Sequence, residues 1–294
     1  MNQNFEEVSC NYCKSKSYRI KYIVDGFNYV QCNECGFVYV NPRLSDDAIK
    51  KLYNEDYFGG KGFDKSVEYK KEFEQQSNTI DLNDWDILAI KGFLPKQNTE
   101  LKLLDVGCGM GLFAYKAKQK GFIAEALELS EFASQFAASN GIKVLRASIE
   151  SAELKSNCYS VISMKEVIEH LPNPTQSLGK IYDSLQNDGI LFLTTGNYNC
   201  PERRIKGNKW FYFMPQGHLQ VFSHKTIRRF LVKAGFRKII VTRQGDLLMN
   251  FLLKTGVIDI NYYKPKSFLK RILFECVRFV NHFISSGMRI YAIK

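Results

Sequence analysis

The 294-residue sequence lacks any run of about 18 consecutive apolar residues, which is the length that a membrane-spanning helix requires. Its first residues, MNQNFEEVSC, lack the basic and apolar regions of a secretory signal peptide. Internal repeats and long low-complexity segments are also absent. These absences predict a cytoplasmic globular protein. In that reducing compartment, closely spaced cysteines bind metal ions more often than they form disulfides.

Acidic residues are scarce in the last third of the chain. Residues 201–294 contain 4 Asp and Glu but 19 Lys and Arg, whereas residues 1–200 contain 26 acidic and 22 basic residues. A basic region of this kind can face nucleic acid, an anionic membrane surface or phosphorylated substrates. It can equally be an ordinary solvated surface in a lysine-rich protein, and the charge alone does not separate these interpretations.

Strand and helix patterns alternate along the chain after Leu101. The predicted strands span residues 101–106, 122–128, 143–146, 159–164, 189–195 and 237–243. The predicted helices between them span residues 111–120, 130–140, 174–186 and 224–234. Continuous apolar strands separated by helices are typical of a parallel sheet that is covered on both faces.

Three further parts are predicted around this alternating region. Residues 1–43 contain short strand-like stretches around four cysteines. Residues 44–98 are helical, with Ser45 as an N-cap and a longer helix over 66–93, and we expect this segment to be a linker or lid. Residues 99–294 form the main domain, with a helical insertion at about 246–286 and a last strand in GMRIYAI.

The four N-terminal cysteines have the spacing Cys-x₂-Cys-x₁₈-Cys-x₂-Cys, which fits a tetrahedral zinc site. The predicted zinc ligands are Cys10, Cys13, Cys32 and Cys35. Zinc held by four thiolates has no open coordination position, so we expect it to be structural rather than catalytic.

A glycine-rich loop, LLDVGCGMG, follows one predicted strand and opens a helix. Glycine lets the backbone turn tightly and approach a ligand closely, and the helix N-terminus favours polar or negative ligand groups. Glu128 ends the next strand, where an acidic side chain can accept hydrogen bonds from ribose hydroxyls. The spacing D-x-G-x-G-x-G differs from the G-x-G-x-x-G of dinucleotide-binding folds, so the loop predicts a nucleotide site of another kind.

These motifs, in this order, resemble those of class I S-adenosylmethionine (SAM)-dependent methyltransferases. The loop LLDVGCGMG looks like their first motif, and ALELS, SVISMKEVIEHLPNP and NDGILFLTTGN follow with similar spacing. CGFVYVNPR and YNEDYF are similar to segments of bacterial members that begin with a zinc ribbon and often accompany glycan-biosynthesis enzymes. The resemblance implies an α/β, doubly wound, mostly parallel seven-stranded sheet of the Rossmann-like methyltransferase type, with a small N-terminal zinc ribbon.

The resemblance also implies a set of cofactor-binding residues. In the family, the acidic residue that ends the first strand binds the methionine amino group, and the acidic residue that ends the second binds the ribose. The residues implied here are Asp105, Gly107, Gly109, Gly111, Glu128, Ser148, Ile149, Met164 and Lys165. Two of them depart from the common pattern, because many relatives have Asp where Ser148 stands and an aromatic residue where Lys165 stands.

Two histidines are candidate catalytic residues. His170, in EVIEHLPNP, follows the fourth strand, and His218 lies in the long connection after the fifth strand. A histidine near an acceptor hydroxyl suits the role of general base. Each can instead be structural, and the sequence leaves both interpretations open.

The reaction that we predict is O-methylation of a sugar or glycan precursor, nucleotide-linked or lipid-linked. Alternatives are a quinone-type O-methyltransferase at the membrane surface, an RNA methyltransferase, and a zinc-ribbon adaptor with an inactive methyltransferase domain. Nucleic acid is disfavoured because the ribbon itself has few basic residues. Residues 264–284 have apolar positions at helical spacing among lysines and arginines, so they either bind the inner face of the membrane peripherally or pack on the core.

Overall fold

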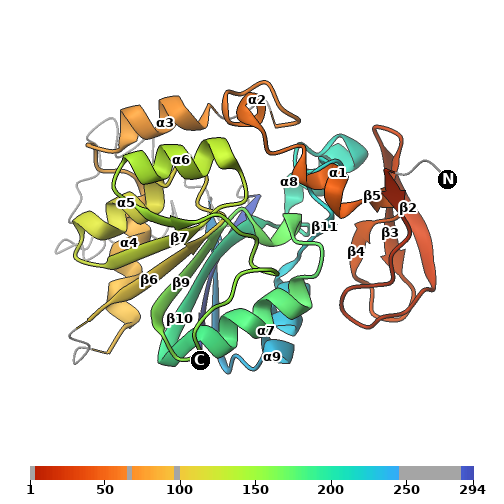
Figure 1. Cartoon of the computed structure of the whole chain (residues 1–294). Helices are drawn as coiled ribbons and strands as arrows, with labels where there is room; N and C mark the ends of the chain where they lie inside the picture. The colour runs from red at the N-terminus through yellow and green to blue at the C-terminus, as the bar shows by residue number, and fades with distance from the viewer. Residues whose placement is uncertain (1–3, 65–67, 96–99, 245–285) are drawn as a thin grey trace, which may run out of the picture.

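The computed structural model describes residues 4–64, 68–95, 100–244 and 286–294 (Figure 1). Its main element is a seven-stranded sheet with the order β12-β13-β10-β9-β6-β7-β8. The strands are β6 (Lys102–Val106), β7 (Ile123–Leu127), β8 (Lys143–Leu145), β9 (Tyr159–Lys165), β10 (Leu185–Gly196), β12 (Lys238–Gln244) and β13 (Gly287–Ile293). Only β13 runs against its neighbours in this sheet, β10 and β12. The predicted mostly parallel seven-stranded sheet is therefore confirmed.

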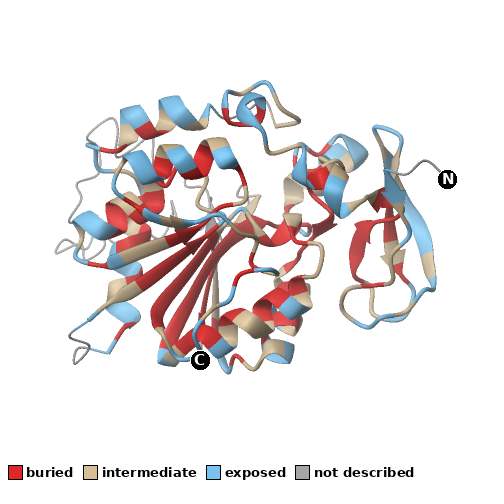
Figure 2. Ribbon diagram, in the orientation of Figure 1, coloured by how far each residue is buried: buried red, intermediate tan, exposed pale blue. Residues whose placement is uncertain are grey.

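Helices cover both faces of this sheet. On one face lie α4 (Leu82–Phe93), α5 (Leu112–Gln119) and α6 (Glu131–Ser139), and on the other lie α7 (Pro174–Ser184) and α9 (His224–Ala234). Successive strand residues pack into opposite layers, as when Leu191 packs with α7 and α9 while Phe192 packs with α4 and α5. The strands are buried almost throughout, and the outer helix surfaces are exposed (Figure 2).

The N-terminal module is built from two small sheets. In the first, β1 (Phe5–Glu6) pairs with β5 (Arg43–Leu44). The second has the order β11-β4-β3-β2 and contains β2 (Tyr18–Val24), β3 (Phe27–Cys32), β4 (Val38–Val40) and β11 (Gln220–Val221). Because β11 comes from the connection after β10, the main domain supplies one strand of the ribbon sheet.

In its described residues, the segment between the ribbon and the main sheet contains four helices. Ser45 caps α1 (Asp46–Lys50) by accepting a hydrogen bond from the backbone of Ala48, as predicted. It is followed by α2 (Glu55–Phe58) and α3 (Tyr69–Gln76). The prediction of one helix over 66–93 is wrong, because Asp81 forms a capping box with Asp84 and starts the new helix α4.

Short elements after β9 and β10 were not predicted: η1 (Ile168–His170), α8 (Pro201–Lys206) and η2 (Gly207–Lys209). The predicted helical insertion at about 246–286 lies outside the described residues, apart from Ser286, and so does the 264–284 segment. Within the described ranges, no helix combines the length and the apolar character needed to cross a bilayer.

Candidate active site

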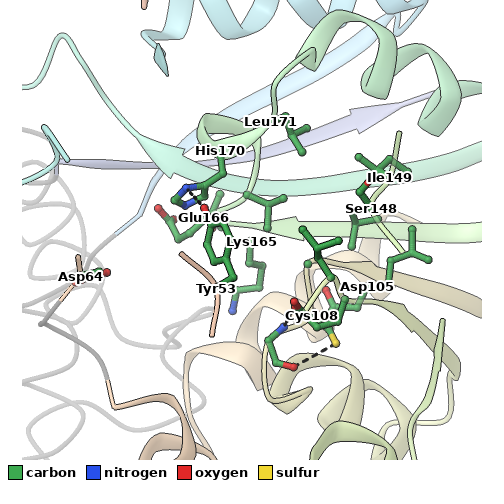
Figure 3. A pocket seen from close by; sticks show the side chains of 18 of the residues that line it. Tyr53, Asp64, Asp105, Cys108, Ser148, Ile149, Lys165, Glu166, His170 and Leu171 are labelled. Carbon is green, nitrogen blue, oxygen red and sulfur yellow. Dashed lines mark hydrogen bonds between the residues drawn. The ribbon is translucent and has the colours of Figure 1, made fainter. Parts of the chain in front are cut away.

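A cavity of about 2240 Å³ lies at the carboxyl ends of the parallel strands (Figure 3). Loops after β6, β7, β8 and β9 line it, together with residues from α1 to α3 and from the start of the ribbon. Ligands of open α/β sheets bind at this edge, where the strand order changes direction. The lining includes nine carboxylate side chains and three Lys or Arg side chains, so the cavity carries a negative field.

The glycine-rich loop forms one wall of the cavity. Gly107 and Gly109 have φ values of 66° and 54°, which favour glycine, and both line the cavity. A side chain on Gly107 would place its Cβ 2.7 Å from Val167 Cγ2. Gly111 does not line the cavity. It serves packing instead, because a Cβ there would lie 2.8 Å from Ala137 Cβ and would push α5 away from α6.

The two predicted cofactor carboxylates lie beside this loop. Asp105 is almost fully buried and accepts a hydrogen bond of 2.7 Å from Ser163 Oγ, and burial raises its pKa to about 6. Glu128 accepts backbone hydrogen bonds of 2.8 Å each from Gly109 and Ser130. Burial still raises the pKa of Glu128, because the desolvation of the carboxylate outweighs these hydrogen bonds.

The remaining predicted cofactor residues are divided between the cavity and the core. Ser148 and Ile149, after β8, and Lys165, at the end of β9, line the cavity. Met164 does not line it: its side chain is fully buried in the apolar layer between the sheet and α7.

His170 and His218 face each other at the cavity, with ring centroids 4.7 Å apart. His170 Nδ1 lies 2.9 Å from the carbonyl oxygen of Gly217 and 2.9 Å from Tyr53 Oη. His218 Nδ1 lies 2.7 Å from the carbonyl oxygen of Tyr212. Since a carbonyl oxygen only accepts, both Nδ1 atoms carry the proton, and both Nε2 atoms are left as acceptors.

Burial keeps both imidazoles uncharged at neutral pH. It lowers the pKa of His170 to about 4. It also lowers the pKa of His218 well below the usual value, and the neighbouring His170 adds to this effect.

The sequence profile of the family described as "Methyltransferase domain" matches residues 87–241, which is more than half of the chain. The chain belongs to this methyltransferase family. The matched residues include the glycine-rich loop, Glu128, Lys165 and both histidines.

Solved methyltransferase structures share the fold. A SAM-dependent methyltransferase from Archaeoglobus fulgidus has a TM-score of 0.50 and 18% identity, over 77% of this chain and 100% of that one. This likeness shows the fold alone.

Curated relatives match a shorter region. An enzyme from Rickettsia canadensis named ubiquinone biosynthesis O-methyltransferase is 38% identical over 106 residues, which is 34% of this chain and 44% of the relative. One of the same name from Photobacterium profundum is 32% identical over 34% of this chain and 45% of the relative. The methyltransferase thus spans less than half the length of these curated relatives.

Three side chains of the methyltransferase cavity were not predicted as site residues. Tyr53 comes from the segment after α1, and Glu166 follows β9 (Figure 3). Tyr212 follows η2. Tyr212 Oη lies 3.0 Å from Glu166 Oε2 and also contacts the buried carboxyl of Glu169. Glu166 has a φ of 51°, an uncommon value for a residue with a side chain. Tyr53 belongs to the YNEDYF segment and Tyr212 to an aromatic stretch in the connection after β10, and tertiary packing brings both to the cavity.

The structure brings the four N-terminal cysteines together. Their sulfur atoms all lie within 4.8 Å of one another, and two pairs are 3.5 Å apart. The two turns are alike. In the first, the backbone N–H of Lys14 donates to the carbonyl oxygen of Cys10, and in the second, that of Gly36 donates to Cys32. Both Lys14 and Gly36 have positive φ. The cluster is made up of Cys10, Cys13, Cys32 and Cys35.

Proposed function

We propose that this protein is a SAM-dependent O-methyltransferase that methylates a hydroxyl group of a small-molecule acceptor. The observation that carries the proposal is that one cavity is lined both by residues of the family's cofactor motifs and by two uncharged imidazoles. SAM supplies an activated methyl group. The residues therefore need to position two molecules and to accept one proton.

One half of the cavity, here called the cofactor half, suits SAM in charge and in hydrogen-bonding groups. It is lined by Asp105, Gly107, Gly109, Glu128, Ser148 and Ile149. Asp105 would bind the amino group of its methionine end, and Glu128 would accept hydrogen bonds from the ribose hydroxyls. Each oxygen of Glu128 that receives a backbone N–H keeps a further lone pair for this purpose. Ser148 and Ile149 would flank the adenine, and the acidic lining favours a ligand with a positive sulfonium.

His170 would act as the general base. Its Nδ1–H is held by the Gly217 carbonyl, which orients the ring and leaves Nε2 unprotonated. The low pKa makes it a weak base but keeps it deprotonated over the whole neutral range. His218, oriented in the same way by Tyr212, would contact the acceptor or share this role.

The acceptor that we propose first is a sugar or glycan precursor. Phe211, whose side chain is 56% exposed, and Tyr53 offer aromatic faces at the cavity, and Glu166 offers a carboxylate to sugar hydroxyls. Because nine carboxylates line the cavity, a phosphate group of a nucleotide-linked or lipid-linked acceptor would lie outside it.

A quinone precursor with a phenolic hydroxyl is the second candidate acceptor. The names of the curated relatives support it. Aromatic rings at the cavity would accommodate such an acceptor as well as a sugar.

The cysteine cluster would hold a structural zinc ion. Four thiolates at a Zn–S distance of about 2.3 Å place their sulfur atoms roughly 3.8 Å apart, and the observed separations fit this geometry. All four coordination positions would be filled by protein, so the ion would stabilise the ribbon and take no part in methyl transfer.

Calorimetry with SAM and with S-adenosylhomocysteine (SAH) tests the cofactor proposal, and we expect both to bind at one site. Incubation with methyl-labelled SAM and separate pools of sugars, nucleotide-linked sugars and catechols then tests the acceptor. Label transferred only to catechols would favour the quinone-type reaction over the sugar reaction. No binding of either SAM or SAH would refute the enzyme proposal.

A further inference from the structure

Lys165 is a cation at the inner end of the cavity. It is the last residue of β9, and 25% of its side chain is exposed. The side chain projects into the pocket between Tyr53 and Asp105 (Figure 3). The family that the sequence resembles commonly has an aromatic residue at this position, so the charge requires its own explanation.

The protein partners of Lys165 leave part of its ammonium group available. Its Nζ donates to Asn83 Oδ1 on α4 and lies 4.9 Å from the centre of the Phe113 ring. Asp86 Oδ2 is 3.8 Å away, which is beyond hydrogen-bond distance, and the other oxygen of Asp86 pairs with Arg289 Nε at 2.7 Å. An ammonium has three N–H donors, so donors remain for a ligand in the cavity.

The other two basic residues of the lining are placed differently. Arg43 is held by Glu6 and Asp46 at 2.6 and 3.1 Å. Lys50 lies on the exposed surface of α1, with 54% of its side chain accessible. Among the lining residues, Lys165 is therefore the basic group beside the cofactor half of the cavity.

The charge pattern around Lys165 is that of a site for a free amino-acid group. Lys165 acts electrostatically on buried Asp105, the residue assigned to the amino group of SAM. The methionine end of SAM carries a carboxylate on the same carbon as this amino group. We propose that Lys165 Nζ binds the α-carboxylate of SAM, so that Asp105 and Lys165 together hold the zwitterionic end. This assignment rests on the proposed function.

Binding of three nucleosides to Lys165→Met separates this role from others. SAM and SAH carry the amino-acid end, whereas 5′-methylthioadenosine lacks it. We expect calorimetry to show SAM and SAH binding on the order of 10- to 100-fold more weakly, as for a lost charged hydrogen bond, and methylthioadenosine binding unchanged. Lys165→Arg should keep most of the affinity for SAM.

Lys102→Met is the matched control. Lys102 starts the adjacent strand β6 at the opposite end of the sheet, does not line the cavity, and should bind all three nucleosides as the wild type does. Unchanged SAM affinity in Lys165→Met, or an equal loss for all three nucleosides, would overturn the assignment. Failure of the wild type to bind SAM would refute the proposed function instead, so the two failures are distinguishable.

Discussion

In the proposed SAM site, Asp105 would connect the affinity for SAM to pH. Burial raises its pKa to about 6, so the group is an anion above that pH and a neutral acid below it. Only the anion attracts the ammonium group of SAM. We therefore expect calorimetry to show SAM affinity highest near pH 7, falling up to about tenfold per pH unit below about 6, and falling again above about 8 as the amino group of SAM loses its proton.

Asp105→Asn provides the comparison. It should bind SAM weakly at neutral pH and lose little more at acidic pH. If the wild-type affinity is the same at about pH 7 and pH 5, Asp105 does not bind the amino group.

His170 should give an unusual pH profile of turnover. With its pKa lowered to about 4, the imidazole stays deprotonated where an ordinary histidine becomes charged. At saturating SAM, kcat should have no acidic limb near pH 6.5. His170→Ala should lower kcat by about 10²- to 10⁴-fold and leave the Kd for SAM unchanged.

His224→Ala is the control, because His224 begins α9 and does not line the cavity. Near-normal turnover by His170→Ala would show that His170 is not the general base. An acidic limb near pH 6.5 in the wild type that His170→Ala removes would show that its pKa is not lowered.

Local motifs predicted several of the residues that line the cavity. Gly107 and Glu128 follow directly after β6 and β7, Ser148 follows the end of β8 by three positions, and the strand ends of a parallel sheet meet at one edge. The prediction that Met164 lines the cavity is wrong. Adjacent residues of a strand point to opposite faces of the sheet, so Lys165 lines the cavity while the Met164 side chain lies in the core. Tyr53 lies in the YNEDYF segment, but its contact with His170 could not be predicted, since it depends on how the segment after α1 packs.

At the scale of elements, Gln220 of β11 holds the turn that carries His170. Its fully buried Nε2 lies 2.8–3.2 Å from the carbonyl oxygens of Ile168, Glu169 and Leu171. Its Oε1 accepts a hydrogen bond from Asn11, inside the first Cys-x₂-Cys turn. Gln220 thus connects the ribbon with η1.

Gln220→Leu should loosen η1 without touching SAM. We expect the free energy of unfolding to fall by about 1–3 kcal/mol, because buried carbonyl oxygens lose their donor. Denaturant unfolding and steady-state kinetics should show this loss with lower kcat and an unchanged Kd for SAM. Gln119→Leu, on the exposed face of α5, should change neither quantity, and equal kcat for Gln220→Leu and wild type would show that the turn is held by other contacts.

Strand and helix types followed closely from the sequence, while their connections did not. All seven strands of the main sheet lie where apolar runs predicted them, within a few residues. The break between α3 and α4 was missed, because helical periodicity continues on both sides of the Asp81 cap. The strand β11 is two residues long, and only its pairing with β4 defines it.

At the scale of the whole molecule, hydrogen bonds join the N-terminal ribbon to the main domain. The side chains of Arg229 and Lys233 on α9 donate to the carbonyl oxygens of Cys35 and Tyr12, one in each cysteine turn. Asn11, in the first turn, donates to Pro172, just after η1. Loss of the proposed zinc ion should therefore change the position of η1 and of His170 at the cavity.

The double substitution Cys10→Ser, Cys13→Ser tests this coupling. We expect it to abolish zinc binding by metal analysis, to lower Tm by several degrees and to lower kcat, because the turn with Asn11 loses its anchor. Cys158→Ser, which removes a thiol outside the cluster, is the control. Full activity and an unchanged Tm in the double variant would mean that the cysteine turns hold their shape without metal.

The acceptor is the property that the sequence predicted least. The part of the cavity proposed for it is lined by residues from the α1 segment, η1 and the connection after β10, and no single motif spans these segments. The basic character of residues 201–294 did not help either, because none of the lysines and arginines that the structure describes there lines the cavity.

The pairing of Tyr39 with Gln220 has a consequence for the order of folding during synthesis. All four cysteines precede β11 in the chain and are synthesised before it, so the proposed metal ion would bind before β11 exists. The sheet that they anchor is complete only after β11 has been made. Until then, β4 presents an unpaired edge, and unpaired edges invite association between chains. Early binding of the proposed metal ion would thus hold β4 in place as a template onto which β11 later pairs.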